Sequence, residues 1–197
     1  MQKFIGTFKA FLFLMGLVVS TPGYAFVEQV MSYGEKYRTS MGLFSSTGLF
    51  EETSEEPEMD ASGVGVFGEV HLQRTPWAVR VDAYSTERKT GDAGLGVNSK
   101  FSELRSWGVG FADVYEGVGF LYGGLGVGVV WPEARMTVLG ESKNIQGKGS
   151  ALGGYMLGMR WLSKLGLFMD ACSHTVYAPV YPNGHLSSVS LGMGYLF

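Results

Sequence analysis

Apolar and polar residues alternate along most of the chain, a period of two that is typical of β-strands. Residues 64–73 show the alternation best, because every second residue from Val64 to Leu72 is apolar or glycine while Glu69 and His71 lie on the opposite face. The alternation resumes at Trp77 after a short turn. The two segments therefore predict a β-hairpin with one apolar and one polar face.

Eight segments carry this alternation, so the sequence predicts eight strands. One set of apolar positions in each segment is assigned to the outward face. These positions are Tyr37, Met41 and Leu43; Val64, Val66, Val70 and Leu72; Trp77, Val79, Val81 and Ala83; Trp107, Val109 and Phe111; Leu121, Leu125, Val127, Val129 and Trp131; Ala151, Tyr155, Leu157, Met159 and Trp161; Leu165, Leu167, Met169 and Ala171; and Val189, Leu191, Met193, Tyr195 and Phe197.

Long and short connectors alternate between these segments. Residues 51–62, 87–102, 132–148 and 178–185 predict long polar loops, and short turns are expected near Arg74, Glu116 and Ser163. The best candidate for a membrane helix after the first 25 residues, the uncharged run 117–131, is too short and too rich in glycine. The fold class predicted is all-β, an antiparallel up-and-down barrel that crosses a membrane with eight strands. A soluble barrel or sandwich is the alternative, but it would turn its apolar face inward.

Tryptophan positions agree with a barrel in a membrane, whose rims favour amphipathic rings. Trp77 and Trp161 are expected near the rim with the short turns, and Trp107 and Trp131 toward the opposite rim.

The polar face predicts what fills the barrel, since eight strands leave an interior just wide enough for side chains. Buried charges need partners, so a network of ion pairs is expected in the lumen. A narrow proton or solute path is the alternative. The predicted network comprises Arg38, Glu69, His71, Arg80, Asp82, Arg160, Asp170 and His174.

The first 25 residues have the three parts of a secretory signal peptide. Lys3 and Lys9 are basic, residues 10–19 are apolar, and Gly23 and Ala25 are small residues at the positions that a signal peptidase reads. We expect cleavage after Ala25, with residues 26–197 forming one barrel domain. Removing Lys3 and Lys9 leaves 13 basic against 18 acidic residues, a balance that argues against nucleic acid as a partner.

Cysteine and histidine show no spacing typical of a metal site, and Cys172 is the only cysteine. No metal, cofactor or catalytic residue is assigned from the sequence. An acidic segment, residues 51–60, could hold a divalent cation through its carboxylates, but a solvated surface loop explains it as well.

The last nine residues resemble the C-terminal assembly signal of bacterial outer-membrane barrels. Phe197 ends the chain, and Leu191, Met193 and Tyr195 share its face. Together with the signal peptide and the eight segments, this resembles the small eight-stranded barrel class of OmpA and OmpX. The resemblance implies a bacterial outer-membrane location, contact with outer-membrane lipids and lipopolysaccharide, and insertion by the barrel-assembly machinery.

Members of this class include structural anchors, adhesion proteins and enzymes that modify lipid A. Residues 172–184 are faintly similar to part of the lipid A deacylase barrels, which place a serine two residues after a histidine and an acid downstream. Here Val176 occupies the serine position, Ser173 precedes His174, and no acid follows. The function expected is therefore a structural or surface-interaction role. An acyl hydrolase of lipid A and a narrow channel are the alternatives.

Overall fold

The structure is a computed structural model that describes residues 39–49, 60–92, 95–115, 118–138 and 141–197. Its strands form one antiparallel sheet. They are β1 (Thr39–Leu49), β2 (Asp60–His71), β3 (Trp77–Asp92), β4 (Leu95–Tyr115), β5 (Gly119–Val138), β6 (Glu141–Gln146), β7 (Ser150–Leu162), β8 (Leu167–Tyr177) and β9 (His185–Leu196), with a short 3-10 helix η1 (Pro182–Gly184) before β9.

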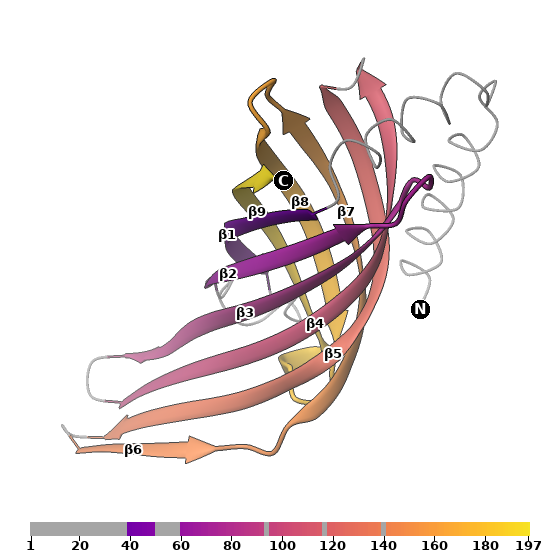
Figure 1. The fold of residues 1–197 in the computed structure, drawn as a ribbon. Coiled ribbons are helices and arrows are strands. Elements are labelled where there is room, and N and C mark those ends of the chain that lie inside the picture. The colour runs from indigo at the N-terminus through magenta and orange to yellow at the C-terminus, as the bar shows by residue number, and fades with distance from the viewer. Residues whose placement is uncertain (1–38, 50–59, 93–94, 116–117, 139–140) are drawn as a thin grey trace, which may run out of the picture.

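Eight of these strands close into a barrel (Figure 1). β1 pairs with both β2 and β9, β4 pairs with β5, and β5 pairs with β7, so the ring has no open edge among the described strands. The ring confirms the predicted antiparallel barrel of eight strands. β6 is an additional strand, which pairs only with β5 in the described part of the chain. None of the described helices is long and apolar enough to span a membrane.

The short turns lie together at one end of the barrel. Arg74 adopts a φ of 59° in the turn between β2 and β3, and Gly166 a φ of 82° between β7 and β8, the left-handed region that tight turns require. The chain closes at the same end, because the Phe197 N–H donates to the Thr39 carbonyl oxygen at 2.9 Å. Trp77 and Trp161 are both exposed beside these turns, at the first residue of β3 and the next-to-last of β7.

Two of the predicted long loops are wrong. Residues 87–92 and 95–102 continue β3 and β4, and residues 132–138 and 141–146 form the hairpin of β5 and β6. We call residues 87–92, 95–101, 132–138 and 141–146 the projecting sheet, which extends past the other strands at the lower left of Figure 1. These segments are polar and show no apolar alternation, so they were predicted as loops. Opposite charges on neighbouring strands stabilise the pairing instead: Lys100 is paired with Glu87 on one side and Glu133 on the other.

The outward face carries a belt of exposed apolar side chains, as predicted for most strands. Leu125 and Val127 of β5 are each 68% exposed, and the outward residues of β9 run from Val189 to Phe197. The corresponding outward residues of β2, β3 and β8 are also exposed and apolar. Such a surface is typical of contact with lipid rather than with water.

The predicted face of β4 is wrong. Trp107, Val109 and Phe111 point into the lumen and are buried, so Trp107 is 1% exposed instead of lying at a rim. Leu104 is the large apolar residue on the outside of this part of β4. The reason lies in the partner strand β5, which places glycines opposite Arg105, Trp107 and Val109.

Glycines opposite large residues let the narrow lumen accept their side chains. Arg105 of β4 is paired with Gly128 of β5, and Trp107 with Gly126. A Cβ added to Gly126 would collide with the Trp107 indole and approach the Ser106 carbonyl oxygen to 2.8 Å. The glycine content of β5 therefore makes room for the bulk of β4.

Candidate functional site

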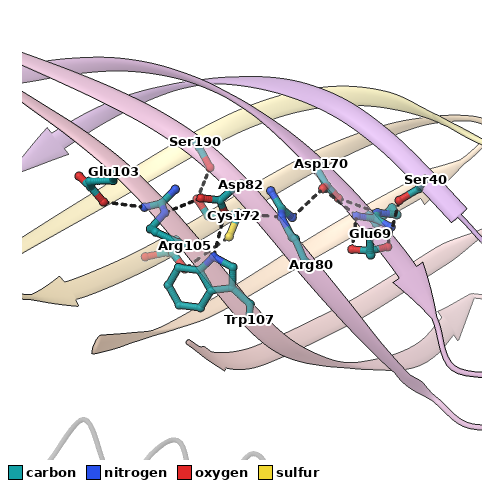
Figure 2. Close-up of polar contacts among 12 residues, drawn as sticks. Ser40, Glu69, Arg80, Asp82, Glu103, Arg105, Trp107, Asp170, Cys172 and Ser190 are labelled. Atoms are coloured by element: carbon teal, nitrogen blue, oxygen red, sulfur yellow. Dashed lines mark hydrogen bonds and ion pairs between the residues drawn. The ribbon is translucent and has the colours of Figure 1, made fainter. Parts of the chain in front are cut away.

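A chain of charged side chains runs along the inside of the barrel. Its members come from five strands, β2, β3, β4, β7 and β8, and every one is buried. Figure 2 shows acids and arginines alternating along the lumen. In order, they are Glu69, Arg160, Asp170, Arg80, Asp82, Arg105 and Glu103.

The shortest contacts of the charge network surround Arg160, which is completely buried. Its guanidinium donates to both oxygens of Glu69, at 2.8 and 3.3 Å, and to both oxygens of Asp170, at 3.0 Å each. Two bidentate carboxylate pairs on one arginine are geometrically specific and stronger than neutral hydrogen bonds. Arg160 therefore joins β7 to β8 and, across the lumen, to β2.

The ion pairs at the centre of the charge network are longer. The Arg80 guanidinium lies 3.6 Å from Asp170 Oδ2 and 3.9 Å from Asp82 Oδ2. It also stacks on the Phe67 ring, with Cζ 3.7 Å from the ring centroid. The aromatic face supplies part of the stabilisation that the longer ion pairs lack.

At the other end of the charge network, Asp82 accepts two hydrogen bonds. Arg105 Nε donates to one Asp82 oxygen at 2.6 Å, and Trp107 Nε1 donates to the other at 2.8 Å. Arg105 also reaches Glu103 at 3.4 Å. The buried indole of Trp107 thus has a hydrogen-bond partner, which explains how it can lie in the lumen.

The network contains three arginines and four carboxylates, so it carries one more acid than its arginines balance. Two further groups contact Glu69: the His71 Nε2 atom lies 2.8 Å from Oε1, and the Ser40 hydroxyl donates to the same oxygen at 3.1 Å. Chemically, the arrangement ties opposite walls of the lumen together with hydrogen-bonded charges.

Seven of the eight residues predicted for the lumen lie there, and Arg38 falls outside the described residues. Six of the seven belong to the charge network or form an ion pair with it, whereas His174 contacts the Ser188 hydroxyl. The sequence reasoning missed Arg105, Glu103 and Ser40. Arg105 and Glu103 share the face of Trp107, so assigning that face to lipid removed both charges from the prediction; the charges themselves were the signal that this face points inward.

The connector after β8 closes the lumen at the end opposite the short turns. The Ala178 N–H bonds to the Gly184 carbonyl oxygen at 3.0 Å, which folds the connector back on itself. Tyr181 is thereby buried, with its ring 5.3 Å from that of Phe101. We call residues 178–184 the capping loop.

The Tyr181 hydroxyl lies against the carboxylate of Glu103, although neither the hydroxyl nor Glu103 Oε1 makes a hydrogen bond of ordinary geometry. Burial raises the pKa of the Tyr181 phenol above its ordinary value, and the charge of Glu103 raises this pKa further. Tyr181 therefore stays protonated and presents a donor to the last acid of the network.

A serine and a histidine do meet inside the barrel, but they are not the expected pair. His174 Nε2 lies 2.6 Å from the Ser188 hydroxyl, and both residues are buried in the lumen. Ser173 is exposed on the outer face of the same strand, because neighbouring residues of a strand point to opposite sides. The deacylase arrangement of histidine, serine and acid is not formed by the described residues around His174.

No group of three or more His, Cys, Asp or Glu residues suited to a metal ion occurs in the described part of the chain. The acidic residues 51–59 lie outside the described residues, so the cation prediction for that segment remains a prediction. Cys172 is a buried free thiol.

Comparisons with known proteins identify the fold. No protein-family model matches the chain, and no curated protein matches its sequence. Neisserial surface protein A has a similar structure, with a TM-score of 0.61 and 12% identity over 81% of this chain and 97% of that one. Ail, the attachment invasion locus protein of Yersinia pestis, gives a TM-score of 0.59 and 16% identity over 82% of this chain and 99% of that one.

A third similar structure is outer membrane protein H of P. aeruginosa, with a TM-score of 0.50 and 14% identity over 81% of this chain and 99% of that one. Identities this low establish the fold and no more. The chain has the fold of the small eight-stranded β-barrels of the bacterial outer membrane.

Proposed function

We propose that the chain is a bacterial outer-membrane barrel with a structural or surface-interaction role. In this proposal the closed barrel is the membrane anchor, and the projecting sheet is the part that meets other molecules outside the cell. Outer-membrane lipids and lipopolysaccharide surround the belt, and the barrel-assembly machinery inserts the chain.

The height of the apolar belt supports the membrane placement. On β5 the outward apolar residues run from Leu121 to Trp131, which matches the about 9–11 residues that a tilted strand needs to cross a bilayer. Beyond Trp131 the outward residues are Glu133 and Arg135. The change from apolar to charged on one strand marks where we expect the lipid to end.

The projecting sheet is the observation that carries the interaction role. It continues past the expected lipid boundary, and all six residues of β6 are exposed. Four strands held clear of the membrane form a rigid platform, which a loop of the same length would not.

A filled lumen argues against the channel alternative. Arg160 and Trp107 are buried between opposing walls, and Tyr181 and Leu186 are buried at the end closed by the capping loop. An eight-stranded barrel filled by side chains leaves little room for solute. A lack of ion conductance by the protein in planar bilayers is the result expected.

Labelling of intact cells tests the placement. Arg135→Cys introduces a thiol at an exposed position of the projecting sheet, and Lys164→Cys introduces one in the short turn between β7 and β8. A maleimide that cannot cross membranes should label the Arg135→Cys protein on intact cells and the Lys164→Cys protein only after permeabilisation. The native thiol of Cys172 is buried, so the wild type is the blank. Equal labelling of both variants on intact cells, or the reverse order, would contradict the proposal.

The hydrolase alternative rests on the contact between His174 and Ser188. Acyl transfer needs a nucleophile that the substrate can reach, and Ser188 is 2% exposed inside the lumen. Incubation of the purified protein with lipopolysaccharide, followed by mass spectrometry for released acyl chains, tests this alternative. Release that Ser188→Ala abolishes would favour the hydrolase over the structural role.

A further inference from the structure

The outer edge of β6 is a strand edge that no described segment covers. β6 ends the order of the sheet, and its pairing with β5 is its only pairing in the described residues. A free edge presents a row of backbone N–H and C=O groups that can bond to another strand. Natural β-sheet proteins usually cover or pair such edges, so an exposed edge is a candidate site for pairing with another strand.

The hydrogen-bond pattern shows which backbone groups are free. The Gly147 N–H donates to the Pro132 carbonyl oxygen at 2.8 Å, so the pair 132–147 is a hydrogen-bonded pair. Such pairs alternate along an antiparallel ladder, so residues 143 and 145 also bond to β5. The N–H and C=O groups of Ser142, Asn144 and Gln146 therefore point away from β5, toward the free edge.

We infer that two copies of the chain pair antiparallel through β6, with Asn144 of each copy at the two-fold axis. This register places Ser142 opposite Gln146 of the second copy and Asn144 opposite its equivalent. The free N–H and C=O groups of Ser142, Asn144 and Gln146 then bond to the backbone of the second copy. The side chains of these three residues are uncharged and can hydrogen-bond to each other. The strands of the projecting sheet continue barrel strands, so antiparallel pairing points the two barrels in opposite directions, and the two copies stand in two facing membranes. The inference rests on the proposed function, because it needs the projecting sheet to stand clear of the membrane.

The opposite face of β6 favours the same register. Centring the pair on Lys143 would place two lysines directly opposite each other, an unfavourable arrangement. Centring it on Asn144 places Lys143 opposite Ile145 of the second copy. Ile145 is 47% exposed, and Met136, the β5 partner of Lys143, is 39% exposed. The aliphatic stem of Lys143 would then lie between Met136 and Ile145 of the second copy and cover apolar surface.

Disulfide cross-linking tests the register. Lys143 and Ile145 of the second copy would form a non-hydrogen-bonded pair, with Cα atoms about 4.5 Å apart, within the range of a disulfide. We would mix Lys143→Cys and Ile145→Cys proteins in equal amounts in detergent micelles, oxidise them, and separate the dimers by mass. The heterodimer should make up nearly all of the cross-linked product, against the half expected from random pairing, and neither variant should cross-link well alone.

Proline substitution tests the edge itself. Asn144→Pro removes an N–H that β5 does not use, and edge strands tolerate proline. Asn144→Ala is the matched control, because it keeps the N–H and removes the side chain. Sedimentation velocity should show at least a tenfold weaker dimer for Asn144→Pro than for Asn144→Ala.

Two results would overturn the inference. One is a cross-linked product dominated by either homodimer, which indicates another register. The other is a wild type that stays monomeric in micelles at every concentration tested. Labelling of Arg135→Cys on intact cells would still support the proposed function in both cases. Loss of that labelling with cross-linking intact would instead count against the function alone.

Discussion

Arg160 is the residue on which the lumen network depends most. It is completely buried and holds Glu69 and Asp170 with four hydrogen bonds, whereas the ion pairs of Arg80 are 3.6 and 3.9 Å long. Removing one partner of a buried ion pair leaves an uncompensated charge in a medium that solvates it poorly. Arg160 should therefore be costlier to remove than Arg80.

Arg160→Met should lower the free energy of unfolding by about 3–5 kcal/mol, because it strands two carboxylates while keeping most of the side-chain volume. Urea titration in detergent micelles measures the change, with Lys164→Met in the exposed short turn as the control. A loss below about 1 kcal/mol, the range of a surface ion pair, would show that the network does not stabilise the barrel.

Tyr181 should make stability depend on pH in the alkaline range. The folded-state pKa of its phenol is raised above the ordinary value of 10, mainly by burial and further by Glu103, so the folded chain holds this proton more tightly than the unfolded chain does. Its contribution is complete below about pH 10 and is lost as pH rises beyond that.

Tyr181→Phe should remove this contribution. The wild type should lose stability more steeply than the variant above about pH 10, where the phenol of the unfolded chain ionises. Unfolding midpoints in urea, compared for the two proteins from pH 8 to 11, measure the difference. Parallel curves over that range would mean that the capping loop does not hold Tyr181 in a buried position.

At the scale of elements, the packing of β4 against β5 depends on glycines of β5 that lie opposite large inward side chains of β4. Gly126→Ala places a methyl group against the Trp107 indole and the Ser106 carbonyl oxygen, whereas a Cβ at Gly68 on the outward face meets nothing within 4 Å. We expect Gly126→Ala to cost about 1–3 kcal/mol through overpacking. Gly68→Ala is the matched control, and urea unfolding monitored by tryptophan fluorescence measures both. Equal stability of the two variants would contradict the packing described for Trp107.

The same pair of strands shows what the sequence pattern could and could not predict. Alternation in β2, β3, β5 and β9 identified their outward faces. β2, β3 and β9 have bulky apolar residues on that side and mostly polar or small ones on the other, and the other side of β5 is rich in glycine. In β4 the bulky residues face inward, since Gly124, Gly126 and Gly128 of β5 leave space for them. That space belongs to a neighbouring strand, so the pattern within β4 cannot reveal it.

The strands of the projecting sheet were not predicted, for a different reason. Both of its faces meet solvent along much of its length, so residues such as those of β6 show no apolar alternation. Its strands are held by backbone pairing and by opposite charges such as Lys100 beside Glu133, which a single strand does not display. The signal peptide, by contrast, lies outside the described residues, and cleavage after Ala25 stays a prediction.

At the scale of the whole molecule, closure and the apolar belt follow from the period of two and from the order of the connectors. Eight alternating segments predicted the eight barrel strands, and the short turns near Arg74, Glu116 and Ser163 predicted which ends lie together. The charge network was predictable in kind, since buried acids require buried bases. Its connectivity across the lumen was not, because Glu69 and Arg160 lie 91 residues apart.

The central claim is that the barrel stands in a bilayer with its belt in lipid and its projecting sheet in water. Single nitroxide labels placed at each position of β5 from Leu121 to Val138, in protein reconstituted into phospholipid vesicles, test it most directly. Accessibility to oxygen should alternate with a period of two from Leu121 to Trp131, and accessibility to a water-soluble nickel chelate should rise from Glu133 onward. Nickel accessibility at Leu125 and Val127 equal to that at Glu133 and Arg135 would contradict the claim.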